Sequence, residues 1–182
     1  MNSDPAIFKE IRSDVDVDRI KSEIDYILKL TEFFSNQIAL QYSATESWHD
    51  GIPNMAHYIA AEEYTYVKWH SALNGTYIKS YMESLDFPVA HARIMKLPSK
   101  TCYTTHVDYY TRYHIPVTSK PLQTFMIFPD KDITARMYPG TLYWTNTHEL
   151  HNFVNGTFED RIHIVFNNAT EPKNLDNEYL YK

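Results

Sequence analysis

The sequence predicts a mainly β fold with flanking helices, in which the strands form a double-stranded β-helix, or jelly roll. From residue 89 onward, short apolar and aromatic runs alternate with turn signals at Pro121, Pro129, Pro139-Gly140 and Asn155-Gly156, which indicates about eight closely spaced strands. Before residue 89, two stretches carry apolar residues at helical spacing. The chain has 182 residues, 43% of them hydrophobic. This predicts one domain over 1–182, with an N-terminal part at 1–88 packing on a jelly-roll core at 89–168.

The N-terminal part begins with a polar lead-in that contains a short strand or arm around residues 6–8. Asp16 or Asp18 is placed to cap a helix, and residues 37–43 alternate between apolar and polar, which is typical of a strand. A second helix is expected over 75–85, ended by Pro88. The apolar residues expected on one face of each helix are Ile20, Ile24, Ile27 and Leu28 in the first and Tyr77, Ile78, Tyr81, Met82 and Leu85 in the second.

Residues 55–72 are rich in aromatic side chains, and their pattern fits either helix or loop. The aromatic residues that fit a hydrophobic core or the mouth of a substrate site are Tyr58, Tyr64, Tyr66 and Trp69. Their irregular spacing favours the core. The histidines predicted to lie at the surface or to be hydrogen-bonded, because no acidic residue or second histidine stands at ligand spacing, are His49, His57 and His70.

The β-rich part contains a pair of residues suited to metal binding. Its expected strands cover 89–97, 102–108, 113–118, 123–128, 134–138, 141–145, 151–154 and 161–167. In the second of these, His106 and Asp108 would share one face while Val107 points to the other. With one distant histidine, they would leave metal positions open, which suits ferrous iron. A closed structural zinc site usually includes Cys, and the chain has 1 Cys.

Arg161 opens the run Arg161-Ile-His-Ile-Val-Phe, whose alternation predicts a buried strand. An arginine whose guanidinium group lies inside a barrel needs an anion to balance its charge. The planar guanidinium is suited to holding a carboxylate through two parallel hydrogen bonds.

Taken together, His106-x-Asp108, His151 and Arg161 ten residues later resemble the signature of the Fe(II)/2-oxoglutarate-dependent dioxygenases. Arg112-Tyr-His114-Ile-Pro-Val-Thr, with the stretches 139–144 and 151–165, is similar to the aspartyl/asparaginyl β-hydroxylase branch, and the resemblance covers roughly residues 90–168. It implies a cupin-like jelly roll.

The resemblance also implies a role for each matching residue. His106, Asp108 and His151 would hold iron and serve as the catalytic centre. Arg161 would bind the distal carboxylate of 2-oxoglutarate, and residues matching Arg112 and His114 contribute to the co-substrate pocket in some members. Fe(II), 2-oxoglutarate and O2 are therefore the expected cofactors and co-substrates, with ascorbate as a reductant.

Several nearby residues compete with this assignment. His148 lies three residues before His151, so the two could be exchanged; His151 is preferred because it alone stands ten residues before Arg161. His163 shares a strand face with Arg161, and pocket lining and structural packing are equally compatible with it. The residues assigned to purely structural or solvated roles are Cys102 in a strand and Asp130 and Asp132 in a turn.

Charge and composition limit the partners and the location. The net charge of -6 argues against nucleic acid as the main partner, and no segment has the apolar length of a membrane span. The single Cys fits a reducing compartment, and the start Met-Asn-Ser-Asp-Pro lacks the features of a secretory signal. We therefore expect a cytoplasmic protein; its oligomeric state is left open.

The expected function is hydroxylation of an unactivated C–H bond of a small amino-acid-like substrate by an Fe(II)- and 2-oxoglutarate-dependent dioxygenase. The substrate would enter where Arg112, His114 and Trp144 flank the metal. Two alternatives stay open: hydroxylation of Asp, Asn or Pro side chains in a protein or peptide, and a non-catalytic cupin-like binding module.

Overall fold

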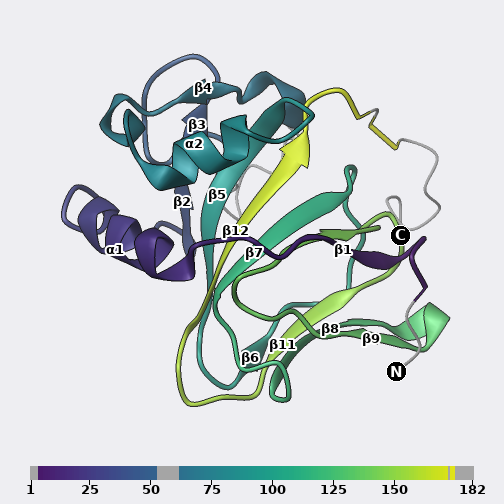
Figure 1. Cartoon of the computed structure of the whole chain (residues 1–182). Helices are drawn as coiled ribbons and strands as arrows, with labels where there is room; N and C mark the ends of the chain where they lie inside the picture. Colours follow the sequence, from purple (N-terminus) through teal and green to yellow (C-terminus); the bar gives the residue numbers. More distant parts are fainter. Residues whose placement is uncertain (1–3, 53–61, 172, 175–182) are drawn as a thin grey trace. The chain divides into compact units, whose positions relative to one another are not determined.

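The computed structural model describes residues 4–52, 62–171 and 173–174, and it is mainly β, with two helices and antiparallel sheets (Figure 1). The predicted fold class is confirmed. The chain divides into two compact units. The barrel unit comprises 1–15, 96–163 and 171–182, and the helical unit comprises 16–95 and 164–170.

The barrel unit contains two antiparallel sheets. In the first, the strands follow the order β1 (Phe8–Arg12), β10 (Leu142–Thr145), β7 (Arg112–Thr118) and β12 (Arg161–Asn168), of which residues 161–163 belong to this unit. In the second, the order is β6 (Thr101–Cys102), β11 (Asn152–Asn155), β8 (Thr124–Phe128) and β9 (Ile133–Ala135). Figure 1 shows β6, β11, β8 and β9 side by side.

The core of the barrel unit draws residues from both sheets. In β8, burial alternates so that Met126 and Phe128 point inward, as period-two patterning requires. Phe8 stacks on Tyr143 with ring centroids 5.2 Å apart. The buried residues of this core are Ile7, Leu97, Met126, Phe128, Ile133, Ala135, Met137, Tyr143 and Phe153.

The turns of the barrel unit follow the sequence signals. A 3-10 turn, η3 (Pro129–Lys131), ends at Asp132, whose φ of 52° is tolerated because Asp adopts left-handed conformations more readily than most residues. Gly140 occupies a turn with φ of 91°, which favours glycine. Asp130 and Asp132 are exposed, so their assignment to a turn is confirmed. Cys102 is an exposed residue of the two-residue strand β6.

The helical unit contains α1 (Val17–Ile27) and α2 (Tyr77–Glu83). Its strands are β2 (Gln37–Ala39), β3 (Gln41–Tyr42), β4 (Lys68–Trp69) and β5 (Val89–Leu97), with short 3-10 turns η1 (Glu63–Thr65) and η2 (Ser71–Leu73). Within this unit the sheet order is β12-β5-β2, and β3 pairs with β4. The carboxylate of Glu23 in α1 accepts hydrogen bonds from the backbone N–H groups of Tyr77 and Ile78, at 2.5 and 2.8 Å, and so satisfies the start of α2.

The two helices differ from their predictions at the ends. Asp16 caps α1 by accepting from the backbone of Arg19 at 3.1 Å, and Ile20, Ile24 and Ile27 are buried as predicted. Leu28 was expected on the buried stripe, but it is the C-cap residue and is 41% exposed. The second helix is shorter than the predicted 75–85 because Gly75 has φ of 81° and Thr76 is the N-cap. Leu85 lies beyond its end.

Three predicted strands are wrong in extent. The run 37–43 breaks at Leu40, whose backbone N–H donates to Ala92 at 2.8 Å, so that β2 pairs with β5 and β3 pairs with β4. The predicted strand 102–108 is reduced to Thr101–Cys102 in β6, followed by an irregular extended stretch. The predicted strand 134–138 is present as Ile133–Ala135.

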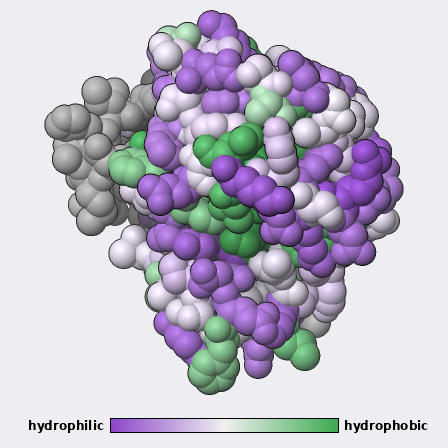
Figure 2. All heavy atoms as spheres, turned by 90° about the vertical axis from the view of Figure 1, so that its left-hand side faces the viewer, coloured by the Kyte–Doolittle hydropathy of each residue, from purple (hydrophilic) through white to green (hydrophobic). Residues whose placement is uncertain are grey.

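Two further findings concern the surface. Among the described residues, no helix has the length and apolar character needed to cross a membrane. The face in Figure 2 is largely hydrophilic, with hydrophobic residues gathered near its centre.

His57 and Tyr58, named in the sequence analysis, lie outside the described residues.

Candidate active site

All of the residues predicted to form the site belong to the barrel unit. His106 and His151 form an isolated antiparallel bridge in which each backbone N–H donates to the other's carbonyl, at 3.0 and 2.9 Å. The backbone N–H of Asp108 donates to Thr147 at 2.8 Å. The ligand atoms of His106, Asp108 and His151 consequently lie within 4.8 Å of one another. One bridge, rather than the predicted continuous strand, brings them together.

The two imidazoles are oriented in the same way. Nδ1 of His106 lies 2.7 Å from the carbonyl oxygen of Thr104, and Nδ1 of His151 lies 2.9 Å from that of Glu149. Donation from Nδ1 leaves the lone pair on Nε2, which is the usual arrangement of metal-binding histidines. Burial lowers the pKa of His151 to about 4, although the charge of Asp108 opposes this, so its imidazole is neutral near pH 7.

Asp108 is held in its ionised form by Arg112. Burial disfavours the charge, but the guanidinium of Arg112 and the neighbouring His151 lower the pKa of the Asp108 carboxyl below its ordinary value. Nε of Arg112 donates to Oδ2 of Asp108 at 3.0 Å. The sequence placed Arg112 in the co-substrate pocket; in the structure it positions the carboxylate of Asp108.

Among the described residues, His148 does not belong to the group of side chains that could hold a metal ion. Its Nδ1 lies 3.3 Å from the backbone oxygen of Asp108, a contact to the main chain rather than to the carboxylate. The geometry therefore groups His151, not His148, with His106 and Asp108.

Arg161 is a buried cation, 2% exposed. Its guanidinium carbon lies 3.5 Å from the centre of the Phe153 ring, and its Nε and Nη1 have no hydrogen-bond partner among the described residues. Burial lowers its pKa to about 10, with a small opposing effect from Tyr103, so the side chain is still charged near pH 7. No carboxylate of the described residues forms an ion pair with it. Burying a charged guanidinium without a partner is unfavourable, so this state favours a bound anion.

The imidazole of His114 is affected by the charge of Arg161 and by the charges of the candidate metal ligands Asp108 and His151. It is buried, and neither of its ring nitrogens has a hydrogen-bond partner within the described part of the chain. Burial lowers its pKa well below the ordinary value, and the charges of Arg161, Arg112 and His151 lower it further, while Asp108 opposes them. Two cations, Arg161 and Arg112, and two of the candidate ligands, His151 and Asp108, therefore act on one imidazole.

These observations test whether the residues fit Fe(II) and 2-oxoglutarate. Two imidazole nitrogens and one carboxylate provide an incomplete ligand set, which leaves positions for a chelating co-substrate and O2. Arg161 provides a buried positive charge that no carboxylate of the described ranges balances. A dicarboxylate that binds a metal at one end and a guanidinium at the other satisfies both, so the residues fit the pair.

Trp144 does not share a face with the site. In the β10–β7 ladder it is paired with Tyr113, whereas Tyr143 is paired with His114 and Thr145 with Arg112. Because side chains alternate along a strand, Trp144 points to the opposite side of the sheet from His114. Its indole N–H donates to Thr111 at 2.9 Å. The expectation that Trp144 flanks the metal is wrong.

Asn155 stabilises the turn that lies between His151 and Arg161. Its amide nitrogen donates to the carbonyls of Leu97, Pro98 and Glu159 at 2.9–3.0 Å. Its amide oxygen accepts from the backbone and the hydroxyl of Thr157, at 3.1 and 2.8 Å. These bonds fix the turn that joins β11 to β12. Asn155 lies in the stretch 151–165 on which the sequence resemblance rests, but the sequence alone gave this residue no specific role.

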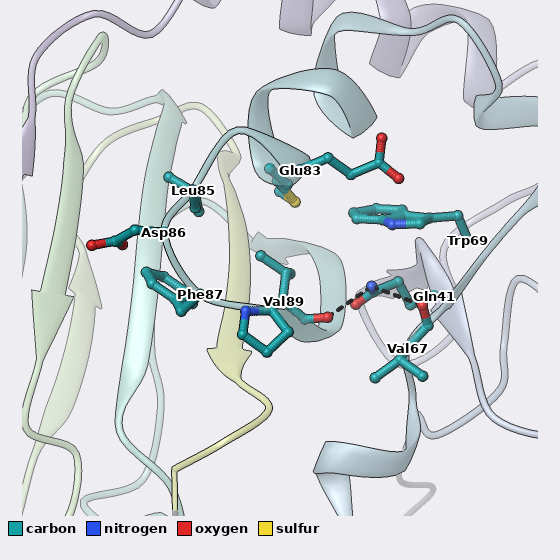
Figure 3. A pocket seen from close by; sticks show the side chains of 10 residues that line it. Gln41, Val67, Trp69, Glu83, Leu85, Asp86, Phe87 and Val89 are labelled. Carbon is teal, nitrogen blue, oxygen red and sulfur yellow. Dashed lines mark hydrogen bonds between the residues drawn. The ribbon is translucent and has the colours of Figure 1, made fainter.

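A separate pocket of about 480 Å³ lies within the helical unit (Figure 3). Its lining includes Trp69, Glu83 and Phe87, and the amide of Gln41 donates to the Val89 carbonyl at 3.0 Å at its wall. Of the aromatic residues proposed for a substrate mouth, Trp69 therefore lines a pocket, whereas Tyr64 is 44% exposed. None of the predicted site residues contributes to this lining.

The histidines outside the site differ in their surroundings. His70 is buried, lies 3.3 Å from Glu46 through Nδ1 and stacks on Trp48 with ring centroids 3.8 Å apart. His49 lies 3.3 Å from the carbonyl oxygen of Glu32 through Nε2. These contacts agree with the expectation of hydrogen-bonded histidines.

No protein-family model matches the chain, and no curated protein matches it. Among solved structures, a viral collagen prolyl hydroxylase from Paramecium Bursaria Chlorella virus-1 is 10% identical, with a TM-score of 0.53, over 91% of this chain and 93% of that chain. The same enzyme in complex with 2OG gives 8% identity and a TM-score of 0.51 over 88% and 94%. HygX from Streptomyces hygroscopicus, with nickel and 2-oxoglutarate bound, gives 9% identity and a TM-score of 0.46 over 93% and 86%. At these identities the prolyl hydroxylase establishes a shared fold.

Proposed function

We propose that this chain is an Fe(II)- and 2-oxoglutarate-dependent dioxygenase that hydroxylates an unactivated C–H bond of a small amino-acid-like substrate. The observation that carries the proposal is the combination of two features in one unit: the open ligand set of His106, Asp108 and His151, and the buried Arg161 without an anion. A binding module that held only a metal would have no need of the second feature.

The residues have distinct roles in this proposal. His106, Asp108 and His151 hold the metal, Arg161 holds the distal carboxylate of 2-oxoglutarate, and Arg112 orients Asp108 through the bond at 3.0 Å. When bound, iron with 2-oxoglutarate and O2 supplies the oxidising power for C–H hydroxylation and releases succinate and CO2. The protein excludes water and fixes the substrate C–H bond near the metal.

The finer assignments also belong to the proposal. Arg112-x-His114 and the ten-residue spacing from His151 to Arg161 support placement in the aspartyl/asparaginyl β-hydroxylase branch. The single Cys supports a reducing, cytoplasmic location as part of the proposal. We propose a free amino acid, rather than a protein side chain, as the substrate, and the assay that follows distinguishes the two.

Release of succinate from 2-oxoglutarate tests the proposal. The chain is incubated with Fe(II), ascorbate and O2, first without substrate and then with each free amino acid, and any stimulated reaction is analysed for a product heavier by one oxygen atom. Stimulation by an amino acid, together with loss of turnover in His106→Ala, is the expected result. If a peptide library stimulates turnover and no free amino acid does, the chain is a hydroxylase of protein side chains rather than of free amino acids. If neither turnover nor metal and 2-oxoglutarate binding is detected, the binding module is the better account.

A further inference from the structure

We propose that His163 is a second co-substrate residue, which donates a hydrogen bond to the distal carboxylate of 2-oxoglutarate beside Arg161. This inference rests on the proposed function, which assigns that carboxylate to Arg161. The sequence alone was equally compatible with two roles for His163, pocket lining and structural packing. The surroundings of its ring decide between these two roles.

His163 is completely buried and lies two residues after Arg161 on β12. Both Nδ1 and Nε2 of its ring lack a hydrogen-bond partner among the described residues. An imidazole that packs for structural reasons normally satisfies at least one of these nitrogens, because burying a polar group without a partner is unfavourable. The unpaired nitrogens therefore point to a partner that the described residues do not supply.

The ring of Phe153 places His163 beside Arg161. The imidazole meets that ring edge-on with centroids 5.3 Å apart, while the Arg161 guanidinium lies over it at 3.5 Å. Residues 161 and 163 also project to the same face of β12. One aromatic side chain on β11 thus holds the cation and the imidazole together.

His114 is the third member of this group. Its ring lies 5.9 Å from that of His163 and 6.1 Å from that of Phe153. Arg161, His114 and His163 together present six buried nitrogen atoms without partners. This concentration of unpaired polar atoms is the strongest indication of a ligand in the described part of the chain.

The charge state of His163 fits hydrogen-bond donation rather than ion pairing. Burial, and the charges of Arg161 and His114, lower the pKa of His163 well below its ordinary value, so the ring is neutral near pH 7. A neutral imidazole carries one N–H, which a carboxylate oxygen accepts. Arg161 supplies the charge, and His163 adds a directed bond to the same group. Recognition of a dicarboxylate, rather than a monocarboxylic 2-oxo acid, would then depend on both residues.

The test compares two 2-oxo acids that differ at the distal end. Calorimetry of the Mn(II)-loaded protein measures the binding of 2-oxoglutarate and of 2-oxobutyrate, which lacks the distal carboxylate. His163→Phe, which keeps an aromatic ring against Phe153, should weaken 2-oxoglutarate binding about 10- to 100-fold and leave 2-oxobutyrate binding unchanged. His163→Gln, which keeps a donor, should recover most of the affinity.

A matched control separates this contact from general effects of replacing a buried histidine. His70 is also buried with an unpaired Nε2, and it belongs to the helical unit. His70→Phe should not change 2-oxoglutarate affinity. Without metal or ligand, His163→Phe should melt at the wild-type temperature or above, because it removes unpaired polar atoms.

Three outcomes overturn the inference. These are unchanged 2-oxoglutarate affinity in His163→Phe, an equal loss for both 2-oxo acids, or a His163→Phe protein that is unfolded or melts below the wild type. Each of them would contradict the proposed contact of His163 with the distal carboxylate. Failure of the wild-type, Mn(II)-loaded protein to bind 2-oxoglutarate is a different result, because it rejects the proposed function itself.

Discussion

Replacing Arg161 with Met should stabilise the ligand-free protein and at the same time remove its affinity for 2-oxoglutarate. Burial lowers the pKa of Arg161 to about 10. Because one pKa unit corresponds to about 1.4 kcal/mol, keeping this guanidinium charged in the folded state costs on the order of 3 kcal/mol. Met has a similar volume and no charge, so the free energy of unfolding should rise by about 1–3 kcal/mol at pH 7.

The sign of the pH dependence follows from the same pKa. A base whose pKa is lower in the folded state than in the unfolded state destabilises the fold while it is charged, and the penalty disappears as it loses its proton. The stability advantage of Arg161→Met should therefore be complete at neutral pH and shrink as the pH rises above about 10. Urea unfolding of both proteins without metal or ligand measures this difference.

Arg161→Lys separates charge from geometry. Lysine keeps the positive charge but cannot form two parallel hydrogen bonds, so 2-oxoglutarate affinity should fall by one to two orders of magnitude, or about 1.5–3 kcal/mol. Calorimetry on the Mn(II)-loaded protein measures this loss. The reasoning is refuted if Arg161→Met is less stable than the wild type without ligand, or if Arg161→Lys binds 2-oxoglutarate as tightly as the wild type.

Three other predictions test separate parts of the structure. His151→Ala should abolish metal binding in equilibrium dialysis while His148→Ala retains it, and the reverse pattern would exchange the two assignments. Asn155→Ala should lower the free energy of unfolding by about 1–3 kcal/mol, because it removes the amide hydrogen bonds to three carbonyls and to the Thr157 backbone, of which the Pro98 and Glu159 carbonyls keep a second donor; an unchanged free energy of unfolding would contradict its role in the turn. Because the pKa values of His114 and His163 are lowered well below the ordinary value, the metal-free protein should lose about 1 kcal/mol for each of these residues per pH unit below pH 6, as the unfolded chain takes up protons that the fold excludes. His163→Phe should reduce this slope in urea unfolding, and an equal slope would contradict the burial argument.

The sequence predicted the fold class because turn signals and period-two patterning are local properties. It also predicted α1, since Asp16 caps the helix and Ile20, Ile24 and Ile27 follow its buried stripe. It could not predict that the strand expected over 102–108 is interrupted, with His106 joined to His151 by an isolated bridge. That outcome depends on where β11 and its preceding turn bring His151, which is a tertiary constraint.

The candidate site shows the same division between local and distant information. The residue types and spacings of His106, Asp108, His151 and Arg161 were visible in the sequence. The ion pair of Arg112 with Asp108 and the unpaired ring of His163 were not, because they depend on burial and on contacts across strands. Trp144 was misplaced because the face of its strand was not known until its pairing with Tyr113 was seen.

The most direct test of the central claim is an anaerobic titration of the Fe(II)-loaded protein with 2-oxoglutarate, followed by visible absorption. A 2-oxo acid that chelates Fe(II) gives a charge-transfer band, so the signal reports metal and co-substrate in the same pocket. We expect the band to appear with one equivalent in the wild type, to be absent in His106→Ala and to require much higher 2-oxoglutarate in Arg161→Met. A wild-type protein that binds Fe(II) but gives no band, or equal titrations of wild type and Arg161→Met, would contradict the claim that one site holds both.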